Sequence, residues 1–261
     1  MDLPRTEAIS PRVRVLASAG STNDALAGFV RDGDEPAYST VLTLNQTGGR
    51  GRLGRVWTAP PDKSLAASVL VRPSSSTFPF GWIPLLAGAA MSSAIDLLVG
   101  DGRTGLKWPN DVQVDGRKVC GVLAELVPSG DAVIVGTGVN LTLAEEELPV
   151  STATSLALAG VAGSAETLVD LVLGRYLAEL AELVERVTAA GDDAVGSGVH
   201  RVVTEWCRTL GRDVRVSLPG DRELYGVATG IDASGRLLVR EQGSGQQTAV
   251  AAGDVTHLRY E

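Results

Sequence analysis

Cysteine, histidine and aromatic residues are scarce in this chain of 261 residues. It contains two cysteines and two histidines, and aromatic residues make up 4% of it. Cys120 and Cys207 are too few for the disulfide framework of a small secreted domain and do not have metal-ligand spacing. We expect both to be buried small hydrophobic residues in a reducing, cytoplasmic compartment. His200 and His257 likewise have no partner spacing that would indicate a metal site or a catalytic triad.

Targeting and membrane signals are also missing from the pattern. The start, MDLPRTE, has neither the basic n-region nor the apolar h-region of a secretory signal. We expect no apolar run to reach the ~18 residues that a membrane-spanning helix needs. The remaining composition, 44% hydrophobic and 21% charged, is that of an ordinary globular protein with one sizeable core. The sequence therefore predicts no membrane partner.

Positive charge is sparse overall and concentrated in one place. The formal net charge of -8 argues against a general affinity for nucleic acid, which requires a basic face. No Asp or Glu occurs from Pro36 to Pro61, and residues 47–58 read TGGRGRLGRVWT. Glycine gives this stretch backbone freedom, and arginine supplies planar donors for phosphate or carboxylate. We expect a loop that is loose when empty and becomes ordered on an anion.

Hydrophobic periodicity predicts an α+β protein in two parts. The first part has strands over 12–18, 38–45, 64–73, 104–108, 111–116, 118–127 and 131–141, and helices over 21–30, 82–99, 166–187 and 193–210. The DGRK turn at 115–118 should join two of these strands as a hairpin. After Gly211, short alternating strands separated by LPGD, DASG and GSGQ turns predict a small β-barrel. The expected domains are 1–210 and 211–261.

The glycine- and arginine-rich loop matches two nucleotide-binding patterns that its context excludes. GRGRLG fits the dinucleotide fingerprint G-x-G-x-x-G, but VWTAPP follows it, and two prolines prevent the helix that this fingerprint must open. With the next residues it also fits the kinase glycine-rich loop. A kinase needs H-R-D and D-F-G motifs, and the sequence contains neither. Taken alone, the loop could equally be a solvated surface segment.

Three further segments each allow a purely structural interpretation. STN at 21–23 could be a helix N-cap, KWPND at 107–111 could be a rigid turn, and GTGVN at 136–140 could be a strand end with close backbone packing. The acidic AEEEL at 144–148 is expected to be a solvated face or a helix start. It is the order and the combination of the first three segments with the loop that is specific.

In combination, these motifs closely resemble the biotin protein ligase family. The family pattern is STN, then Q-x-x-G-R-G-R-x-G-R-x-W, KWPND, K-x-x-G and G-x-G-x-N, and here it spans Ser21 to Asn140. The C-terminal β module, with AAGDVTHLR near its end, is also similar to the family's small barrel. The resemblance implies a mixed-sheet catalytic domain like that of class II aminoacyl-tRNA synthetases. Because 20 residues precede Ser21, the winged-helix DNA-binding domain of many relatives, and with it repressor function, is not expected.

The resemblance implies that biotin's carboxylate attacks the α-phosphorus of ATP, and that a carrier lysine then takes the biotinyl group from biotinyl-AMP. Two anions meet in the first step, so the site must neutralise charge, with Mg²⁺ as a further cation. The implied catalytic residues are Lys118, Arg50, Arg52 and Asp111. Biotin is expected to contact Ser21, Thr22, Asn23, Gln46, Arg50, Gly51, Arg52 and Lys118. ATP is expected to contact Arg52, Arg55, Trp57, Asn110, Lys118 and Asn140, and the metal ligands are not assigned.

Two alternatives of other kinds remain at this point. A lipoate ligase or acyl-transferase of related fold would share the two-step chemistry, although the GRGRxGR loop and the terminal module argue against it. A non-enzymatic single-strand-binding module should carry stacking aromatic residues beside its basic loop, and these are few. The expected partner is the biotin carboxyl carrier protein of a biotin-dependent carboxylase, without nucleic acid. We expect a monomer or a weak homodimer.

Overall fold

A seven-stranded mixed sheet forms the centre of the protein. The computed structural model describes residues 1–218, 220, 222–251 and 253–258. The strand order is β1-β2-β5-β9-β8-β7-β6, and all neighbours are antiparallel except the parallel pair β1 and β2. The strands are β1 (Val13–Val15), β2 (Thr40–Thr43), β5 (Ser64–Val71), β6 (Thr104–Lys107), β7 (Asp111–Val114), β8 (Arg117–Leu126) and β9 (Val133–Asn140).

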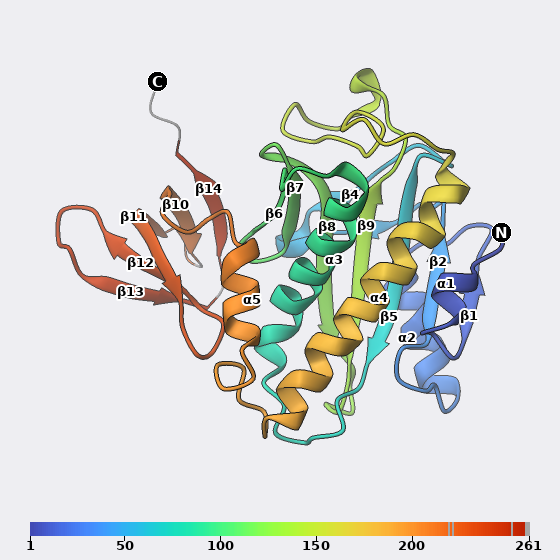
Figure 1. Cartoon of the computed structure of the whole chain (residues 1–261), viewed down its shortest axis with the longest axis horizontal. Helices are drawn as coiled ribbons and strands as arrows, with labels where there is room; N and C mark the ends of the chain where they lie inside the picture. Colours follow the sequence, from blue (N-terminus) through green and yellow to red (C-terminus); the bar gives the residue numbers. More distant parts are fainter. Residues whose placement is uncertain (219, 221, 252, 259–261) are drawn as a thin grey trace.

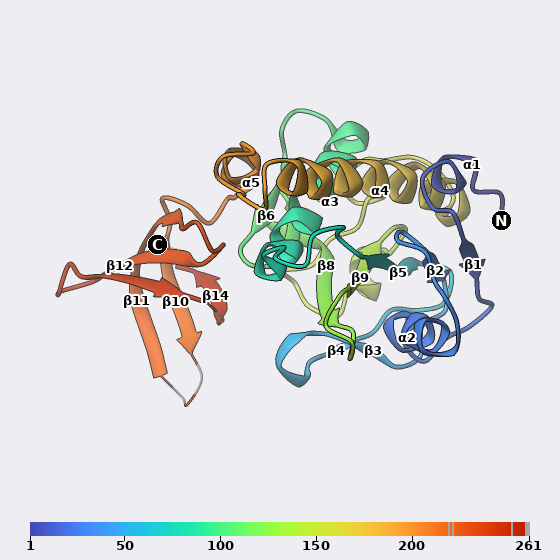
Figure 2. The ribbon, with the colours of Figure 1, turned by 90° about the horizontal axis from the view of Figure 1, so that it is seen from below.

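Helices cover both faces of this sheet. The short α1 (Pro4–Glu7) and the longer α3 (Ile83–Val99) and α4 (Ala165–Ala189) lie on one face, and α2 (Thr22–Asp32) lies on the other (Figures 1 and 2). Every residue of β5 is buried, since its side chains face helices on alternate sides. Leu65 and Val69 join the large core under α3 and α4, whereas Leu70 packs under α2. A sheet buried on both faces explains why β5 reads as a continuous apolar run.

The central helix α3 corrects one expectation from the sequence. Phe80–Val99, which comprises the 3-10 turn η2 (Phe80–Trp82) and α3, is long and apolar enough to cross a membrane by length and composition alone. In the fold α3 packs between the sheet and α4, and residues such as Leu86, Met91 and Ile95 are fully buried. Its apolar character is therefore accounted for by the core of this fold.

A second, five-stranded sheet lies beside the first, at the left of Figures 1 and 2. It comprises β10 (Asp213–Leu218), β11 (Arg222–Ile231), β12 (Leu237–Glu241), β13 (Gln247–Val250) and β14 (Asp254–His257). The order is β13-β12-β11-β10-β14, with all pairs antiparallel. The small all-β module expected after Gly211 is therefore present as an antiparallel sheet of short strands.

Most expected elements occur, and several are shorter than expected; the strand expected over 38–45, for example, is β2 over Thr40–Thr43. The predicted strand 12–18 contains only Val13–Val15. The predicted helix 193–210 contains α5 (Val199–Trp206), which contacts β6 and β11. Gly198, with a φ of 74°, precedes α5, and Cys207 after it is extended and bridges to Leu106. A left-handed glycine before the helix and a bridge after it leave room for about two turns.

Candidate active site

A pocket opens on the α2 side of the main sheet, beneath the glycine- and arginine-rich loop. In the structure this loop is a short hairpin of β3 (Gly49–Arg50) and β4 (Val56–Trp57), with the 3-10 turn η1 (Arg52–Gly54) between them. We call residues 49–57 the lid. The pocket brings together nearly all residues that the sequence assigned to it: Ser21, Thr22, Asn23, Gln46, Arg50, Gly51, Arg52, Arg55, Trp57, Asn110, Asp111 and Lys118.

Glycines on β8 and β9 form the floor of the pocket. A Cβ atom on Gly136 would lie 2.3 Å from Asn23 Oδ1, and one on Gly138 would lie 2.6 Å from Trp57 Cε2. A Cβ atom on Gly121 would meet Lys118 Nζ at 3.0 Å. Because side chains from α2, the lid and β8 rest directly on this backbone, any larger residue would displace them. The glycines therefore set the depth of the pocket.

A hydrogen-bonded cluster at the start of α2 lines one end of the pocket. Ser21 is the N-cap of this helix, with its hydroxyl accepting from the Asp24 N–H at 3.4 Å. The Thr22 N–H donates to Gln46 Oε1 at 2.9 Å. The hydroxyl of Ser68 on β5 lies 2.7 Å from Thr22 Oγ1 and 2.6 Å from Asn23 Oδ1. The N-cap interpretation of STN is thus confirmed, and the cap fixes the start of the helix that presents Thr22 and Asn23 to the pocket.

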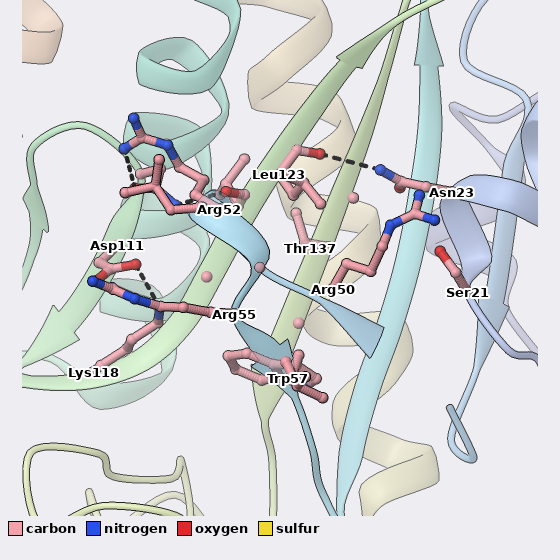
Figure 3. Close-up of a pocket in the computed structure, with 18 of the residues that line it drawn as sticks. Ser21, Asn23, Arg50, Arg52, Arg55, Trp57, Asp111, Lys118, Leu123 and Thr137 are labelled. Carbon is pink, nitrogen blue, oxygen red and sulfur yellow. Dashed lines mark hydrogen bonds and ion pairs between the residues drawn. The ribbon is translucent and has the colours of Figure 1, made fainter. Parts of the chain in front are cut away.

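An ion pair and an aromatic ring line the opposite end. Lys118 Nζ lies 2.6 Å from Asp111 Oδ1, and the two residues come from the neighbouring strands β8 and β7. The same ammonium lies 5.7 Å from the centroid of the Trp57 ring. Figure 3 shows Lys118 and Asp111 on one side of the pocket, and Ser21 and Asn23 on the other. This arrangement places a cation between an aromatic face and a carboxylate.

The three lid arginines have different surroundings. Arg50 donates to both oxygens of Asp24 at 2.7 Å and to Glu125 at 3.1 and 3.2 Å, and the Asp24 hydrogen bonds raise the pKa of its guanidinium. Arg55 donates to Asp254 of β14, which raises its pKa in the same way. Both of these arginines are therefore already neutralised by carboxylates.

Arg52 is the exception. Its Nη1 donates to Asn110 Oδ1 at 3.2 Å, and within the described residues no carboxylate lies at ion-pair distance from it. Burial lowers the pKa of its guanidinium, because a charge removed from water is less stable. A half-buried cation that pairs with no carboxylate of the described residues is the side chain of the lid best placed to receive an anion.

One predicted residue does not reach the pocket. Asn140 is 3% exposed, its Nδ2 donates to the Thr154 carbonyl at 2.9 Å, and its Oδ1 accepts from the Ser64 hydroxyl at 3.3 Å. Its amide therefore ties β9 to β5 and to the segment after β9. In this structure that places it outside the lining of the pocket, where ATP contact was expected.

The motifs did not assign four other residues: Gly253 and Asp254 line the pocket, and Asp24 and Glu125 lie behind its wall, paired with Arg50. Asp24 stands directly after the STN motif, and Glu125 lies on β8 four residues after Gly121. Asp254 and Gly253 come from the second sheet, about two hundred residues along the chain from the lid. Adjacency to a motif could have indicated Asp24, whereas Glu125 and Asp254 are brought in by tertiary packing alone.

Metal-binding capacity at the pocket is limited. Within the described residues no group of three or more His, Cys, Asp or Glu side chains could hold a metal ion. Asp111 lines the pocket and its carboxylate is 22% exposed. One carboxylate suits Mg²⁺ that arrives on a phosphate group, because Mg²⁺ usually keeps several waters and binds one or two carboxylates.

Comparisons with known proteins agree with this geometry. Residues 15–141 match the Biotin/lipoate A/B protein ligase family, and residues 209–258 match the Biotin protein ligase C terminal domain. The biotin–[acetyl-CoA-carboxylase] ligase of Mycobacterium tuberculosis is 36% identical over 94% of this chain and 88% of its own length. That of Paracoccus denitrificans is 33% identical, with 81% and 88% covered. The biotin protein ligase of Aquifex aeolicus in complex with biotin and ATP superposes with a TM-score of 0.76 at 25% identity, covering 95% of this chain and 99% of that one. The chain belongs to the biotin protein ligase family.

Proposed function

We propose that this protein is an ATP-dependent biotin protein ligase. In the first step a carboxylate oxygen of biotin attacks the α-phosphorus of ATP, pyrophosphate leaves, and biotinyl-AMP is formed. In the second step the amine of an acceptor lysine attacks the acyl carbon, AMP leaves, and the amine loses a proton. The observation that carries the proposal is a glycine-floored pocket with a hydrogen-bonding cluster at one end and Lys118 with Arg52 over the other.

The residues divide between the two substrates according to their chemistry. Biotin's ureido group is neutral and has both donors and an acceptor, which suits the hydroxyls and amides of Ser21, Thr22, Asn23 and Gln46. Trp57 offers an aromatic face beside Lys118. Arg50 and Gly51 belong to the lid and border the biotin end of the pocket. Arg50 is held by Asp24 and Glu125, so it shapes the pocket wall at that end.

Charge neutralisation falls to Lys118 and Arg52. The reacting carboxylate and the α-phosphate are both negative, and fixed cations lower the barrier by stabilising the charge that builds up between them. Lys118 lies on β8 and Arg52 on the lid, and both line the pocket, so an anion bound there meets two cations from different elements. Asn110 accepts from Arg52 and donates to the Val122 carbonyl at 2.8 Å, which orients Arg52 toward the pocket. Arg55 lies at the same end of the pocket as Lys118 and Asp111 (Figure 3).

Mg²⁺ fits this site as an ion that is bound to the triphosphate of ATP. When bound it would supply positive charge to the phosphate oxygens. Asp111, which lines the pocket, would hold it, and its carboxylate also lies 2.6 Å from the Lys118 ammonium.

The acceptor is the biotin carboxyl carrier protein of a carboxylase, consistent with the names of the relatives. We further propose a cytoplasmic, monomeric or weakly dimeric protein that does not bind nucleic acid. Residues 1–210 form the catalytic domain and 211–261 a smaller domain.

The test is exchange of radiolabelled pyrophosphate into ATP with Mg²⁺ present. Exchange that requires biotin supports the proposal. Exchange that requires lipoate instead, or that occurs with neither acid, contradicts it. Transfer is then measured as biotin bound to a purified carrier domain, with a carrier whose acceptor lysine is replaced by arginine as the control.

A further inference from the structure

Arginines at the two ends of the lid form ion pairs with different parts of the protein. At the β3 end, Arg50 contacts Asp24 of α2 and Glu125 of β8. At the β4 end, Arg55 contacts Asp254, the first residue of β14 in the second sheet. Figure 3 shows Arg50 directed to the side of Asn23, and Arg55 to the side of Asp111. The second sheet thus contributes one carboxylate that pairs with the lid.

The backbone around Asp254 is positioned closely. A Cβ atom on Gly253 would lie 2.8 Å from Val216 Cγ1 and 3.0 Å from the Ser217 carbonyl oxygen, so the chain here runs against β10. Asp254 also pairs with Ser217 in the β10–β14 ladder. This packing fixes where the carboxylate lies relative to the lid, whereas Arg55 stands on a hairpin of two-residue strands. The carboxylate is therefore the anchored partner, and the arginine is the movable one.

The two attachments differ in strength. Arg50 contacts two carboxylates, and its contact with Asp24 is bidentate. Arg55 contacts one carboxylate through one nitrogen, and its side chain is 62% exposed. Exposed single ion pairs are worth little and break readily. Burial raises the pKa of Asp254, but the hydrogen bond and charge of Arg55, with the charges of Lys107 and Arg52, together outweigh it. The pKa of this carboxyl is therefore below its usual value, and the carboxylate is ionised at neutral pH.

We propose that Asp254 is a positioning residue that holds the lid closed over the pocket through Arg55, so that the second sheet controls how often the lid opens. This rests on the proposed function, in which the lid must shield biotinyl-AMP and then admit an acceptor lysine. Opening occurs at the Arg55 end, because that attachment is the weaker one. Asp254 itself need not touch either substrate.

The first test measures lid opening without any substrate. Trypsin can cut the Arg52–Leu53 bond when the lid opens, and at low protease its rate follows the population of the open form. Asp254→Asn keeps this site and removes one charge. For an exposed ion pair we expect it to speed cutting about two- to fivefold. Glu223→Gln is the matched control, since it removes a carboxylate of the same sheet that pairs with Arg215, away from the lid.

Rescue variants separate the ion pair from a change in β14 itself. Asp254→Glu keeps the charge, and the exchange Arg55→Glu with Asp254→Arg reverses the pair while leaving the Arg52–Leu53 bond intact. Both should return cutting to near the wild-type rate. Cutting by Asp254→Asn no faster than by Glu223→Gln overturns the proposal. Faster cutting that neither rescue variant reverses also overturns it, because the cause would then be disruption of the strand.

The second test uses biotin-dependent pyrophosphate exchange. Asp254→Asn should raise the KM for ATP by about the same factor as it raises trypsin cutting, with kcat within about twofold of wild type. A fall in kcat with unchanged KM contradicts a positioning role. If wild type shows no biotin-dependent exchange, the proposed function fails, whereas the trypsin comparison still decides whether Asp254 closes the lid.

Discussion

Replacing Gly138 by alanine tests whether the glycine floor shapes the pocket. The new methyl group would lie 2.6 Å from Trp57 Cε2 and 2.8 Å from Cζ2. Carbon atoms pack at about 3.5–4.0 Å, so the indole must move by roughly 1 Å. The backbone of Trp57 is paired with Gly49 across the β3–β4 ladder, so β3 follows a displacement of β4. The lid must therefore rise with it.

The cost should fall on ligand binding more than on folding. Overpacking typically costs about 1–3 kcal/mol, and Trp57 belongs to a half-exposed hairpin outside the buried core. If the strain is relieved by displacing the lid, the affinity for the ligand that Trp57 contacts falls about 5- to 150-fold. The fold loses less than about 1 kcal/mol, which lowers the melting temperature by less than about 4 °C.

Calorimetric titration with biotin, and then with ATP, measures the loss for Gly138→Ala, and thermal melting measures the fold. Gly20→Ala is the control, because Gly20 immediately precedes Ser21 and a Cβ there would meet no atom within 4 Å. Unchanged affinity for both ligands with a melting temperature equal to wild type would refute the reasoning. A large fall in melting temperature would show that Trp57 is held as rigidly as the core.

Three further predictions follow from the same geometry. Lys118→Ala should lower the rate of pyrophosphate exchange about 10²- to 10³-fold. The melting temperature should not change, because the Lys118 side chain is one-third exposed. Exchange within tenfold of the wild-type rate would contradict the proposed role of Lys118. Arg52→Gly removes a charge-assisted contact worth about 1.5–3 kcal/mol, so the variant should release biotinyl-AMP about 10- to 150-fold faster. The release is measured as additional biotin bound to an unrelated lysine-rich protein. If adenylation is intact and this labelling stays at the wild-type level, the lid does not retain the intermediate. Glu35 lies buried against Arg14 and Arg12, and the Arg14 hydrogen bond above all lowers its pKa from 4.5 to about 2. The ionised Glu35 carboxylate therefore stabilises the fold by roughly 3 kcal/mol above pH 4.5, and this stabilisation is lost as the pH falls toward 2. In Glu35→Gln the free energy of unfolding should fall less between these pH values than in wild type. An equal fall in both proteins would refute this prediction.

Local chemistry made much of the fold predictable. The DGRK turn is formed as expected, because Asp115 and Gly116 take φ values of 50° and 77°, the left-handed pair that a two-residue hairpin turn needs. β5 was predicted correctly from its run of apolar and small residues, because the strand is buried on both faces of the sheet. STN fixed both the start of α2 and one end of the pocket, since a cap and its neighbours are adjacent in the chain.

Long-range packing explains what the sequence could not supply. The contact of Arg55 with Asp254 joins residues 199 positions apart, and no periodicity reports such a pairing. At Asn140 the motif predicted a contact with ATP. In the structure its amide instead donates to the Thr154 carbonyl and accepts from the Ser64 hydroxyl. The helix predicted over 193–210 was too long because helical periodicity does not register Gly198 or the Cys207 bridge.

The balance of charge at the pocket has a consequence for its ligands. The cations that line it are matched in number by the carboxylates in or directly behind its wall: Arg50, Arg52, Arg55 and Lys118 against Asp24, Asp111, Glu125 and Asp254. An anionic substrate therefore enters a site with little net charge, and each of its contacts competes with an existing ion pair, except at Arg52. Additional positive charge at the phosphates is the role proposed above for Mg²⁺, which binds one or two carboxylates and does not need a preformed protein cage. The same balance keeps three arginines close together on one short hairpin, where their mutual repulsion would otherwise hold the lid open.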